Sequence, residues 1–528
     1  MKKIMYVFAL VAFVFTSCDK NEVTIKKAET HSDISNNSSD PEMIKLGKKR
    51  ENPYSLENVT KAYQTLQTDG VLRVPINIQA TNLYVRFLPK SEEEYQTLKK
   101  QGYELFDYPL EYERIEGGSY YHDPSLPTNG FTWIYVVLPI DYIFGEIKYE
   151  IISELVLQSE SEVSSISAQK LKGIDTNYWS QIEQKSFELT GNEYYSKKES
   201  TSGMMKAKVK PTGKITLDDE VLAKEIGIPG VKVRASRWFT AKYAYTDADG
   251  NYTFGYTFSG PVDYSIVWER EDWDIRNGVW AQATYNGPNT VTSSWSIKIN
   301  KSDKQYVYAN AHRACYTYWL NISSFGIKTP PKNSFFSPRV KIGVYDTAGR
   351  AYSSPLLRWA TVPSICIYSY SENKDGSSTK NSSARLYQTT IHELAHTSHW
   401  EIDKSAFWDV DNKIVESWAV CVAYNVANAT YPYSFSSWQY VSKTVIIDTY
   451  EKKYTPLMID LMDNYNQYDS SLADEFVNDE VSGYTLKQIE GALKGAKKMD
   501  QLKDNLKTLY DNPTEDKLDE LFTFYANI

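Results

Sequence analysis

The chain has 528 residues, which is too long for a single hydrophobic core and indicates three or four domains. Its composition, 41% hydrophobic and 24% charged, is that of a soluble globular protein. A formal net charge of −9 lacks the basic excess of a general nucleic-acid-binding protein, so we expect no nucleic-acid partner. Aromatic residues make up 14% of the chain, and 42 of them are tyrosines, which favour packing in sheets. Contact with glycans or peptides is the alternative role for these tyrosines.

The N-terminus has the layout of a secretory signal peptide. Two lysines precede an apolar run over residues 4–15, which is too short to span a membrane. The sequence "FTSC" ends at Cys18 and resembles the lipobox of bacterial lipoproteins, in which cleavage precedes a cysteine that is then acylated. This resemblance implies a signal peptide at 1–17 and a lipid anchor on Cys18 in the bacterial envelope, at the outer membrane or cell surface. An ordinary signal peptide is the alternative.

The next segment, residues 18–55, is polar and rich in Ser, Asn, Asp and Lys, so we expect a flexible tether. Residues 56–200 then mix strand and helix patterns. "NLYVRFLP", "YELFDYPL" and "FTWIYVVLPI" are predicted strands, while "SEEEYQTLKKQG" is a predicted helix with a capping box between Ser91 and Glu94. This region is predicted to be a small α+β domain without a chemical motif. His122 lies in the turn-like "SYYHDPS" and is expected to be a solvent-exposed loop histidine.

Residues 206–298 consist of short alternating segments separated by turn signals, a spacing typical of a small β-sandwich. The pattern of Gly, then Pro-Gly-Val, then Thr-Asp-x-x-Gly-x-Tyr resembles the carboxypeptidase regulatory-like (transthyretin-like) domains. The matching residues are Gly213, Pro229, Gly230, Val231, Thr246, Asp247, Gly250 and Tyr252. The resemblance implies an accessory module. Asp247 and its neighbours are expected to form a turn, because the twelve-residue loop of a calcium site is missing.

Residues 304–528 are predicted to form a further domain. "KQYVYANAHRACYTYWLNI" is a predicted helix, "RVKIGVYD" and "VPSICIYSYS" are predicted strands, and the segment beyond residue 450 is helical in pattern. Cys315, Cys366 and Cys421 allow at most one disulfide, and we expect buried thiols for at least two of them. The chain as a whole is therefore predicted to be a multidomain α+β protein.

Residues 392–396 spell His-Glu-Leu-Ala-His within "RLYQTTIHELAHTSHW", which contains no Pro or Gly and is predicted to be helical. On a helix, His392 and His396 lie one turn apart on one face, so both imidazoles can bind one Zn²⁺ ion. Glu393 lies beside them, where its carboxylate can take a proton from a water at the metal. A buried helix with two satisfied histidines is the alternative.

A catalytic zinc needs a third protein ligand and an open position. Glu416 in "IVESWAV" is the one acidic residue in the apolar run 414–426, and a lone carboxylate on a buried helix is costly unless it is paired or metal-bound. An exposed helix edge is the alternative for Glu416, and Asp403 and Asp409 are rival ligands. His399, two turns along the first helix, is expected to be a supporting or rim residue.

The motif, a gap of nineteen residues and a glutamate on a second predicted helix resemble the gluzincin metallopeptidases, which have the thermolysin-like zinc fold. The resemblance spans roughly 304–528 and implies a zincin-like catalytic domain with a helical tail and Zn²⁺ as cofactor. The resemblance implies that His392, His396 and Glu416 are zinc ligands and that Glu393 is the general base. It also implies that "SICIYSY" is the edge strand that pairs with an extended substrate.

Two positions depart from this pattern. Thermolysin-like enzymes place an acidic residue four positions after the glutamate ligand to orient a histidine, and here that position is Val420. No histidine follows residue 399, so a tyrosine would have to stabilise the oxyanion, and Tyr424 and Tyr454 are the candidates.

These features predict a zinc-dependent metallopeptidase of endopeptidase or aminopeptidase type that acts on a peptide or protein and is held at a membrane by its lipid anchor. A non-catalytic surface lipoprotein that binds glycan or protein on a zincin-like scaffold is the alternative. A hydrolase of a non-peptide bond is the third reading, because the same metal site supports that chemistry.

Overall fold

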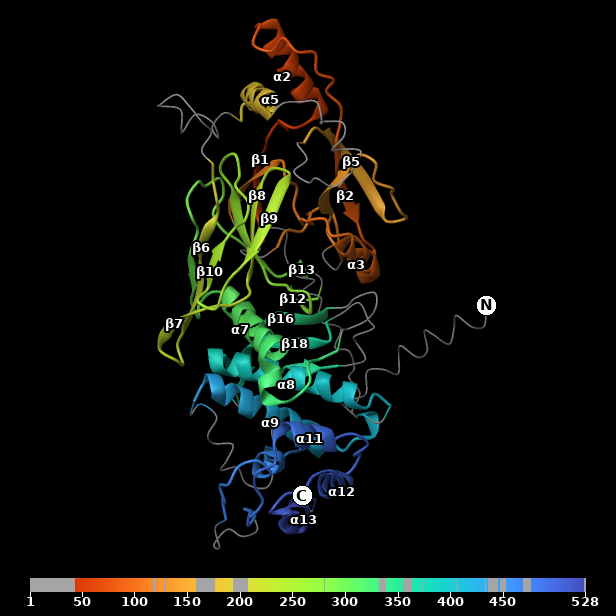
Figure 1. Ribbon diagram of the computed structural model, residues 1–528, viewed down its shortest axis with the longest axis vertical. Helices are drawn as coiled ribbons and strands as arrows, with labels where there is room; N and C mark the ends of the chain where they lie inside the picture. The colour runs from red at the N-terminus through yellow and green to blue at the C-terminus, as the bar shows by residue number, and fades with distance from the viewer. Residues whose placement is uncertain are drawn as a thin grey trace, which may run out of the picture.

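A computed structural model describes most of the chain between residues 43 and 526 (Figure 1). The described residues are 43–116, 120–127, 130–157, 176–192, 208–279, 281–331, 339–354, 363–373, 375–405, 407–432, 434, 445–446, 453–468 and 476–526. The structure is mixed α/β with several separate sheets, as predicted for the multidomain α+β class. Figure 1 shows the elements stacked roughly in chain order along the longest axis. The signal peptide at 1–17 and the acylation site Cys18 lie outside the described residues.

Among its described residues, the N-terminal part contains a three-stranded antiparallel sheet in the order β4-β2-β5, a strand pair β1-β3 and three helices. These elements are β1 (Lys45–Lys49), α2 (Leu56–Thr68), β2 (Asn82–Leu88), α3 (Glu92–Lys100), β3 (Tyr112–Glu116), β4 (Ile134–Pro139), β5 (Lys148–Leu155) and α5 (Thr176–Leu189). The predicted strands at β2 and β4 and the predicted helix at α3 are confirmed. The Ser91 side chain accepts the backbone N–H of Glu94, whereas the Glu94 carboxylate accepts from Lys90, so half of the predicted capping box forms.

Two predictions for this part are wrong. The segment 103–110 forms only an isolated bridge between Phe106 and Tyr135 instead of a strand, because the Asp107 carboxylate takes the Tyr121 N–H and Pro109 has no N–H to donate. The predicted tether at 18–55 extends too far, because β1 is paired with β3. Ile44 and Tyr54 are also buried in the N-terminal core, which holds this end of the segment in the fold.

Residues 212–299 contain two four-stranded sheets whose side chains share one hydrophobic core; we call these two sheets the sandwich. The first sheet has β6 (Thr212–Asp219), β7 (Lys224–Gly227), β10 (Asn251–Thr253) and β15 (Ile297–Ile299), and the second has β8 (Lys232–Arg237), β9 (Thr240–Tyr245), β11 (Asp263–Val267) and β14 (Thr284–Asn286). The Asp247 carboxylate accepts the backbone N–H groups of Asp249 and Asn251, so it forms a turn. Gly250 has φ +83° in that turn, and a Cβ there would lie 2.2 Å from the Ile215 carbonyl oxygen.

Two strands of this region join the C-terminal sheet instead of the sandwich. β12 (Trp273–Asn277) pairs with β13 (Ala281–Gln282) and runs parallel to β16 (Val340–Ala348). With β17 (Tyr352–Ser353) and β18 (Ile365–Glu372), the sheet has the order β13-β12-β16-β18-β17. The chain therefore crosses the predicted domain boundary near residue 300 before it returns to form β14 and β15. Trp273 and Ile275 are buried in the core that also holds the side chains of β16, which explains the crossing.

The C-terminal part packs helices against this sheet and ends in short helices. Its elements are α7 (Gln305–Tyr316), β16 (Val340–Ala348), β17 (Tyr352–Ser353), β18 (Ile365–Glu372), β19 (Ser378–Lys380), α8 (Ser383–Ile402), α9 (Asn412–Thr430), β20 (Val445–Ile446), β21 (Lys453–Tyr454), α10 (Leu457–Asp460), α11 (Leu486–Ala492), α12 (Met499–Leu509) and α13 (Leu518–Ala526). The predicted helix and both predicted strands are confirmed. The tail is less helical than predicted, because α10 has four residues and Gly495, with φ +75°, separates α11 from α12.

One continuous core runs through the sandwich and the C-terminal part, whereas two smaller cores lie in the N-terminal part. Cys315, Cys366 and Cys421 are buried free thiols, as expected from their number. Within the described ranges, no helix has the length and apolar character needed to cross a membrane.

Candidate metal centre

Helix α8 carries the His-Glu-x-x-His motif, and its sequence explains why it forms. The Ser382 side chain accepts the Arg385 N–H at the N-terminus, and no Pro or Gly interrupts the helix. Leu394 and Ala395 are fully buried in the core and fix the rotation of the helix. The histidine side of α8 then faces α9, against which α8 packs.

Helix α9 supplies the acidic residue. The Asp411 carboxylate accepts the Lys413 N–H and caps the helix, which runs antiparallel to α8 after a short connection. Glu416 lies in the second turn and is 4% exposed, so the alternative of an exposed helix edge is wrong. A buried carboxylate needs a partner, and the two histidines of α8 are beside it.

The three side chains converge on one point. The Nε2 atoms of His392 and His396 are 3.1 Å apart, and the Glu416 Oε2 atom is 3.3 Å from the first and 3.4 Å from the second. Zinc with tetrahedral bonds of about 2.0–2.1 Å requires ligand atoms about 3.3 Å apart, so the triangle matches one face of that tetrahedron. Within the described parts of the chain, no other group of three His, Cys, Asp or Glu residues has ligand atoms this close together. The residues fit zinc.

Electrostatics keep the Glu416 carboxylate ionised. Burial acts to raise the pKa of Glu416, but the adjacent imidazoles of His396 and His392 lower this pKa well below its usual range. An ionised carboxylate is the form that binds a metal cation. The site therefore provides two imidazole nitrogens and one carboxylate oxygen, which is the donor set of several hydrolytic zinc sites.

Glu393 lies close enough to Cys366 of β18 for its charge to act on that thiol, a relation that the sequence did not indicate. Glu393 is 5% exposed, and its charge contributes to raising the pKa of the Cys366 thiol on β18. Burial is the largest cause and raises this pKa to about 11, against hydrogen bonds from the Tyr352 and Tyr345 hydroxyls. Cys366 is therefore a neutral thiol beside the motif. The sequence held no signal for this contact, because it depends on how β18 packs against α8.

A second missed feature anchors the ligand helices. Asp219, at the end of β6 in the sandwich, is fully buried. Its carboxylate accepts the Ser383 hydroxyl of α8 at 2.7 Å, the hydroxyl of Tyr431 after α9 at 2.7 Å and the Arg313 guanidinium of α7 at 3.2 Å. The neighbouring Glu220 accepts the Ser383 N–H at 3.1 Å. Acidic groups at the N-terminus of α8 also suit its helix dipole.

Three predicted residues lie away from the metal cluster. The His399 ring packs edge-on against Phe407, with 5.2 Å between ring centroids, and burial lowers the pKa of His399 to about 3. The rival ligands are engaged elsewhere, since Asp409 forms an ion pair with Lys497 and Asp403 accepts the Ser405 hydroxyl. Neither aspartate belongs to the group of His392, His396 and Glu416.

The oxyanion candidates find no support in the geometry. Tyr424 lies eight residues beyond Glu416 on α9, and the helical rise separates their Cα atoms by about 12 Å. The backbone of Tyr454 forms β21, but its side chain lies outside the described residues. The position four after Glu416 is the buried Val420, and the buried Nδ1 atom of His396 has no hydrogen-bond partner among the described residues.

The strand β18 is not the free edge that was expected. β16 pairs along one side of it, and on the other side β17 pairs at Ile365 and Cys366 while β19 pairs at Tyr370–Glu372. An extended substrate could not add along the whole strand without displacing β17 or β19.

Comparison with known proteins adds no relative. No protein-family model and no curated protein matches the chain. The candidate site is therefore argued from its own residues.

Proposed function

We propose that this protein is a zinc-dependent metallopeptidase. The observation that carries the proposal is the triangle of His392, His396 and Glu416 ligand atoms, with edges of 3.1–3.4 Å, beside the buried Glu393. Two histidines four residues apart on one helix and a glutamate on the antiparallel neighbour leave a fourth position for water or substrate.

In this mechanism His392, His396 and Glu416 would hold the metal, which would supply Lewis-acid polarisation of the scissile carbonyl and a lowered pKa of the attacking water. Glu393 accepts the proton of the attacking water and then donates it to the leaving amine. Its position one residue after His392 directs its carboxylate to the side of the metal rather than onto it. His392 is the more exposed ligand, with 16% of its side chain accessible, so we place the substrate entrance on its side.

The resemblance to gluzincins supports the assignment of 304–528 as a zincin-like catalytic domain, and the two sheets at 212–299 support a carboxypeptidase regulatory-like accessory module. The peptide or protein substrate of such an enzyme is not fixed by the fold. A non-catalytic scaffold and a hydrolase of another bond are the two competing functions that the experiment below separates.

We also propose that Cys18 is acylated and holds the enzyme at the bacterial envelope. The signal-peptide layout and the "FTSC" sequence support this proposal. Replacing Cys18 with Ser removes the acylated thiol, so the protein should leave the membrane fraction and lose incorporation of labelled fatty acid. A variant that stays in the membrane fraction would exclude the anchor.

The test of the proposed function begins with the metal content of the purified protein. The wild type is expected to hold about one zinc per chain, and His396→Ala and Glu416→Ala should lose it, because each removes a ligand from a three-residue site. His399→Asn and Glu401→Ala are the matched controls, since these residues lie on the same helix but outside the cluster. A wild type without stoichiometric zinc would contradict the proposal.

The catalytic step is tested with Glu393→Gln, which should keep its zinc and lose about 10²- to 10⁴-fold in cleavage of a mixed peptide library. Full activity in this variant would remove Glu393 from the mechanism. Zinc binding without peptide cleavage by the wild type would instead support the non-catalytic scaffold, and cleavage of an ester or amide panel alone would support the third function.

A further inference from the structure

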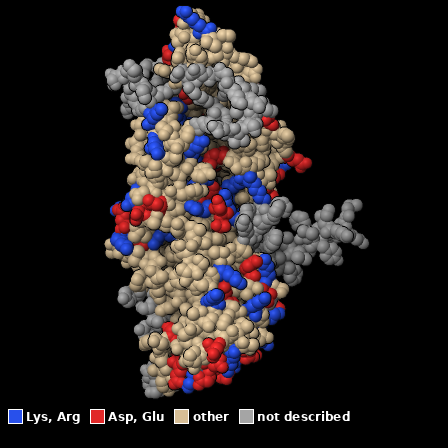
Figure 2. All heavy atoms as spheres, viewed as in Figure 1, with Lys and Arg blue, Asp and Glu red and all other residues tan. Residues whose placement is uncertain are grey.

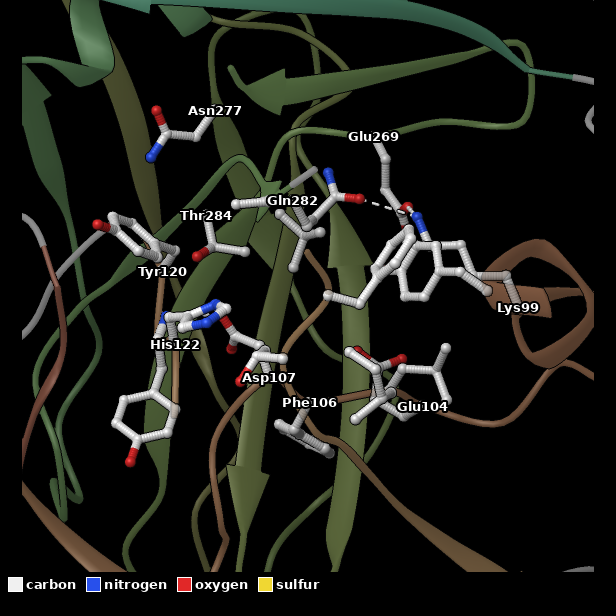
Figure 3. Close-up of a pocket in the computed structure, with 18 of the residues that line it drawn as sticks. Lys99, Glu104, Phe106, Asp107, Tyr120, His122, Glu269, Asn277, Gln282 and Thr284 are labelled. Carbon is white, nitrogen blue, oxygen red and sulfur yellow. Dashed lines mark hydrogen bonds and ion pairs between the residues drawn. The ribbon is translucent and has the colours of Figure 1, made fainter. Parts of the chain in front are cut away.

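A cavity of about 930 Å³ lies where the N-terminal part, the sandwich and the C-terminal sheet meet. Its walls come from α3 and the segment after it, from β8 and β9, and from β12 and β13 (Figure 3). None of the residues of the metal centre lines it. Clefts and cavities at domain junctions are common places for ligands, and this volume is at the upper end of the usual range.

Aromatic rings form much of the wall. Seven Tyr or Phe residues line the cavity, among them Tyr95 and Phe131, whose rings stack with centroids 5.3 Å apart. Tyr243 is 54% exposed, although monomeric proteins generally bury large aromatic side chains. Flat ring faces next to hydrogen-bonding groups suit ligands that have both apolar faces and polar edges.

Polar side chains lie on two opposite sides of the cavity, and each side offers both hydrogen-bond donors and acceptors. Figure 3 shows Tyr120, His122 and Asp107 on one side and Lys99, Glu269 and Gln282 on the other. His122 is not the solvent-exposed loop histidine that its sequence indicates, because its Nε2 atom is buried and has no hydrogen-bond partner within the described ranges. Such an atom is costly unless a ligand or water meets it.

Positive charge exceeds negative charge in the lining. It contains five Lys or Arg residues and three Asp or Glu residues, a surplus of two positive charges. On the face shown in Figure 2, basic and acidic side chains gather at mid-height, where the N-terminal part meets the sandwich. Burial also raises the pKa of the Asp107 carboxyl, against the hydrogen bond from the Tyr121 backbone N–H.

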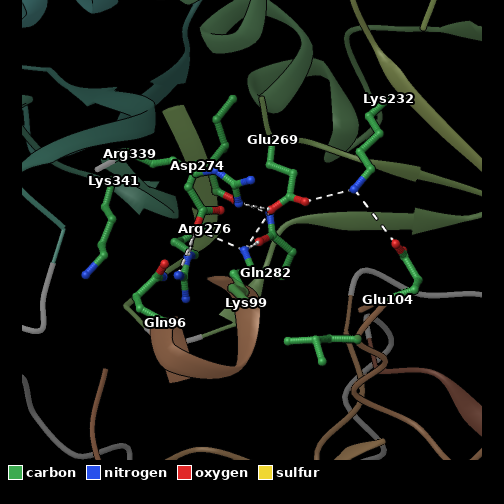
Figure 4. A network of polar contacts seen from close by, with 12 residues as sticks. Gln96, Lys99, Glu104, Lys232, Glu269, Asp274, Arg276, Gln282, Arg339 and Lys341 are labelled. Carbon is green, nitrogen blue, oxygen red and sulfur yellow. Dashed lines mark hydrogen bonds and ion pairs between the residues drawn. The ribbon is translucent and has the colours of Figure 1, made fainter. Parts of the chain in front are cut away.

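Glu269 forms ion pairs with three of the basic side chains that line the cavity. It accepts from Lys99 at 2.7 Å, from Lys232 at 3.0 Å and from Arg339 at 3.0 Å (Figure 4). Burial acts to raise the pKa of Glu269, but Lys99 and then Lys232 hold this pKa well below its usual range. Lys99 also donates to Gln282 and pairs with Asp274, and Lys232 also lies 4.0 Å from the Glu104 carboxylate. Arg339 donates one N–H to Glu269 and keeps 27% of its side chain exposed, and a guanidinium has five N–H donors, so its remaining donors suit a second anionic group.

We propose that this cavity binds an acidic saccharide, through its hydroxyls and ring faces on the aromatic side and through its anionic group on the side of Arg339 and Lys232. Hydroxyl groups both donate and accept, so they match a wall that mixes carboxylates, amides and an imidazole. A cavity suits a compact ring better than an extended peptide, which docks along strand edges or grooves. The site is independent of the proposed zinc chemistry.

The binding test uses the full-length chain with Glu393→Gln, so that turnover cannot obscure the titration. Tetragalacturonate, 3′-sialyllactose and a sulfated disaccharide are titrated calorimetrically, and these arms separate carboxylate from sulfate and uronic from sialic acids. Maltotetraose is the neutral control and tetraglutamate the peptide control. At least one acidic saccharide is expected to bind about tenfold or more tightly than both controls. No binding in any saccharide arm, or binding of tetraglutamate alone, would overturn the proposal.

The location is tested with Arg339→Gln, His122→Ala and Tyr243→Ala, each expected to weaken the binding by about tenfold or more. Tyr245→Ala is the matched control, because Tyr245 lies on the same strand, is 42% exposed and does not line the cavity. The zinc content should not change in any of these variants. Binding that survives all three changes would place the saccharide elsewhere and overturn the assignment.

Discussion

Among the described residues, no buried cation lies beside the acidic residue Asp460. It is 1% exposed on α10, and burial raises the pKa of its carboxyl group to about 7, against the Tyr525 hydroxyl, which donates to Oδ2 at 2.5 Å. Burial likewise raises the pKa of Asp479 to about 8, and the nearby Asp460 adds to that rise. Two carboxyl groups in this helical tail therefore hold protons at pH values where exposed carboxyl groups are ionised.

These shifts make stability depend on pH. An unfolded Asp has a pKa of about 3.9, so between about pH 4 and pH 7 the folded state holds a proton that the unfolded state has released. The free energy of unfolding then falls as the pH rises through this window, by up to about 1.4 kcal/mol per pH unit. Asp460→Asn, a neutral isostere, should flatten this fall and melt at a higher temperature than the wild type at pH 8. Asp500→Asn, at an exposed position, is the control, and an unchanged pH slope in Asp460→Asn would refute the argument.

The grouping of His392, His396 and Glu416 was predictable from the sequence because each position follows from a local rule. Helical spacing brings His392 and His396 together, and the cost of a lone buried carboxylate selects Glu416. Cys366 was not predictable as a neighbour of Glu393, because that contact depends on the packing of a strand against a helix. The tyrosine candidates were chosen from composition alone, and neither has a described position at the cluster.

At the scale of elements, α8 and α9 form the site only if their relative position is held. Asp219 joins the first turn of α8 to the residue after α9, and it also balances the buried charge of Arg313. The sandwich thus fixes the end of the helix pair that is furthest from the connection between the two helices. We therefore regard Asp219 as a positioning residue for the ligand helices.

Asp219→Ala should destabilise the protein by about 3 kcal/mol or more, because it leaves the Arg313 guanidinium buried without its anionic partner. Zinc affinity should fall as well, although no ligand is changed, and thermal melts with and without added zinc measure both effects. Asp218→Ala removes the exposed neighbouring carboxylate and is expected to have little effect. Equal melting temperatures for the two variants would contradict the role of Asp219 in positioning α8 and α9.

Elements with strong periodicity or clear caps were predicted well, as α3, α8 and β2 show. Residues 273–277, which form β12, fell within the predicted sandwich region 206–298 but pair in the C-terminal sheet, because a strand of alternating residues carries no mark of its partner. Its parallel pairing with β16 joins segments about seventy residues apart, which local pattern does not specify. The resemblance to gluzincins implied that β18 is an edge strand, but the two-residue β17 and the three-residue β19, which are too short to be recognised in the sequence, pair with it.

At the scale of the whole molecule, the cores divide the chain differently from the predicted domains. One core contains side chains of the sandwich, of β12 and of the helices up to α13, whereas the N-terminal part has two separate cores. Trp238 and Phe239 of the sandwich enter the N-terminal core, and Lys99 of α3 binds Glu269 and Asp274. These links are small beside the shared core, so two cooperative units are expected in place of three domains.

Hydrogen exchange at increasing denaturant concentration tests this division. Amide protons of β11, in the sandwich, and of α9, which carries Glu416, should become exchangeable at the same denaturant midpoint. The side chains of both elements are buried in one core, so we expect the two elements to unfold together. Amide protons of β2 should have a different midpoint. A common midpoint for β2 and β11 with a separate one for α9 would mean that the sandwich belongs with the N-terminal part, and that Asp219 links two independently folding units.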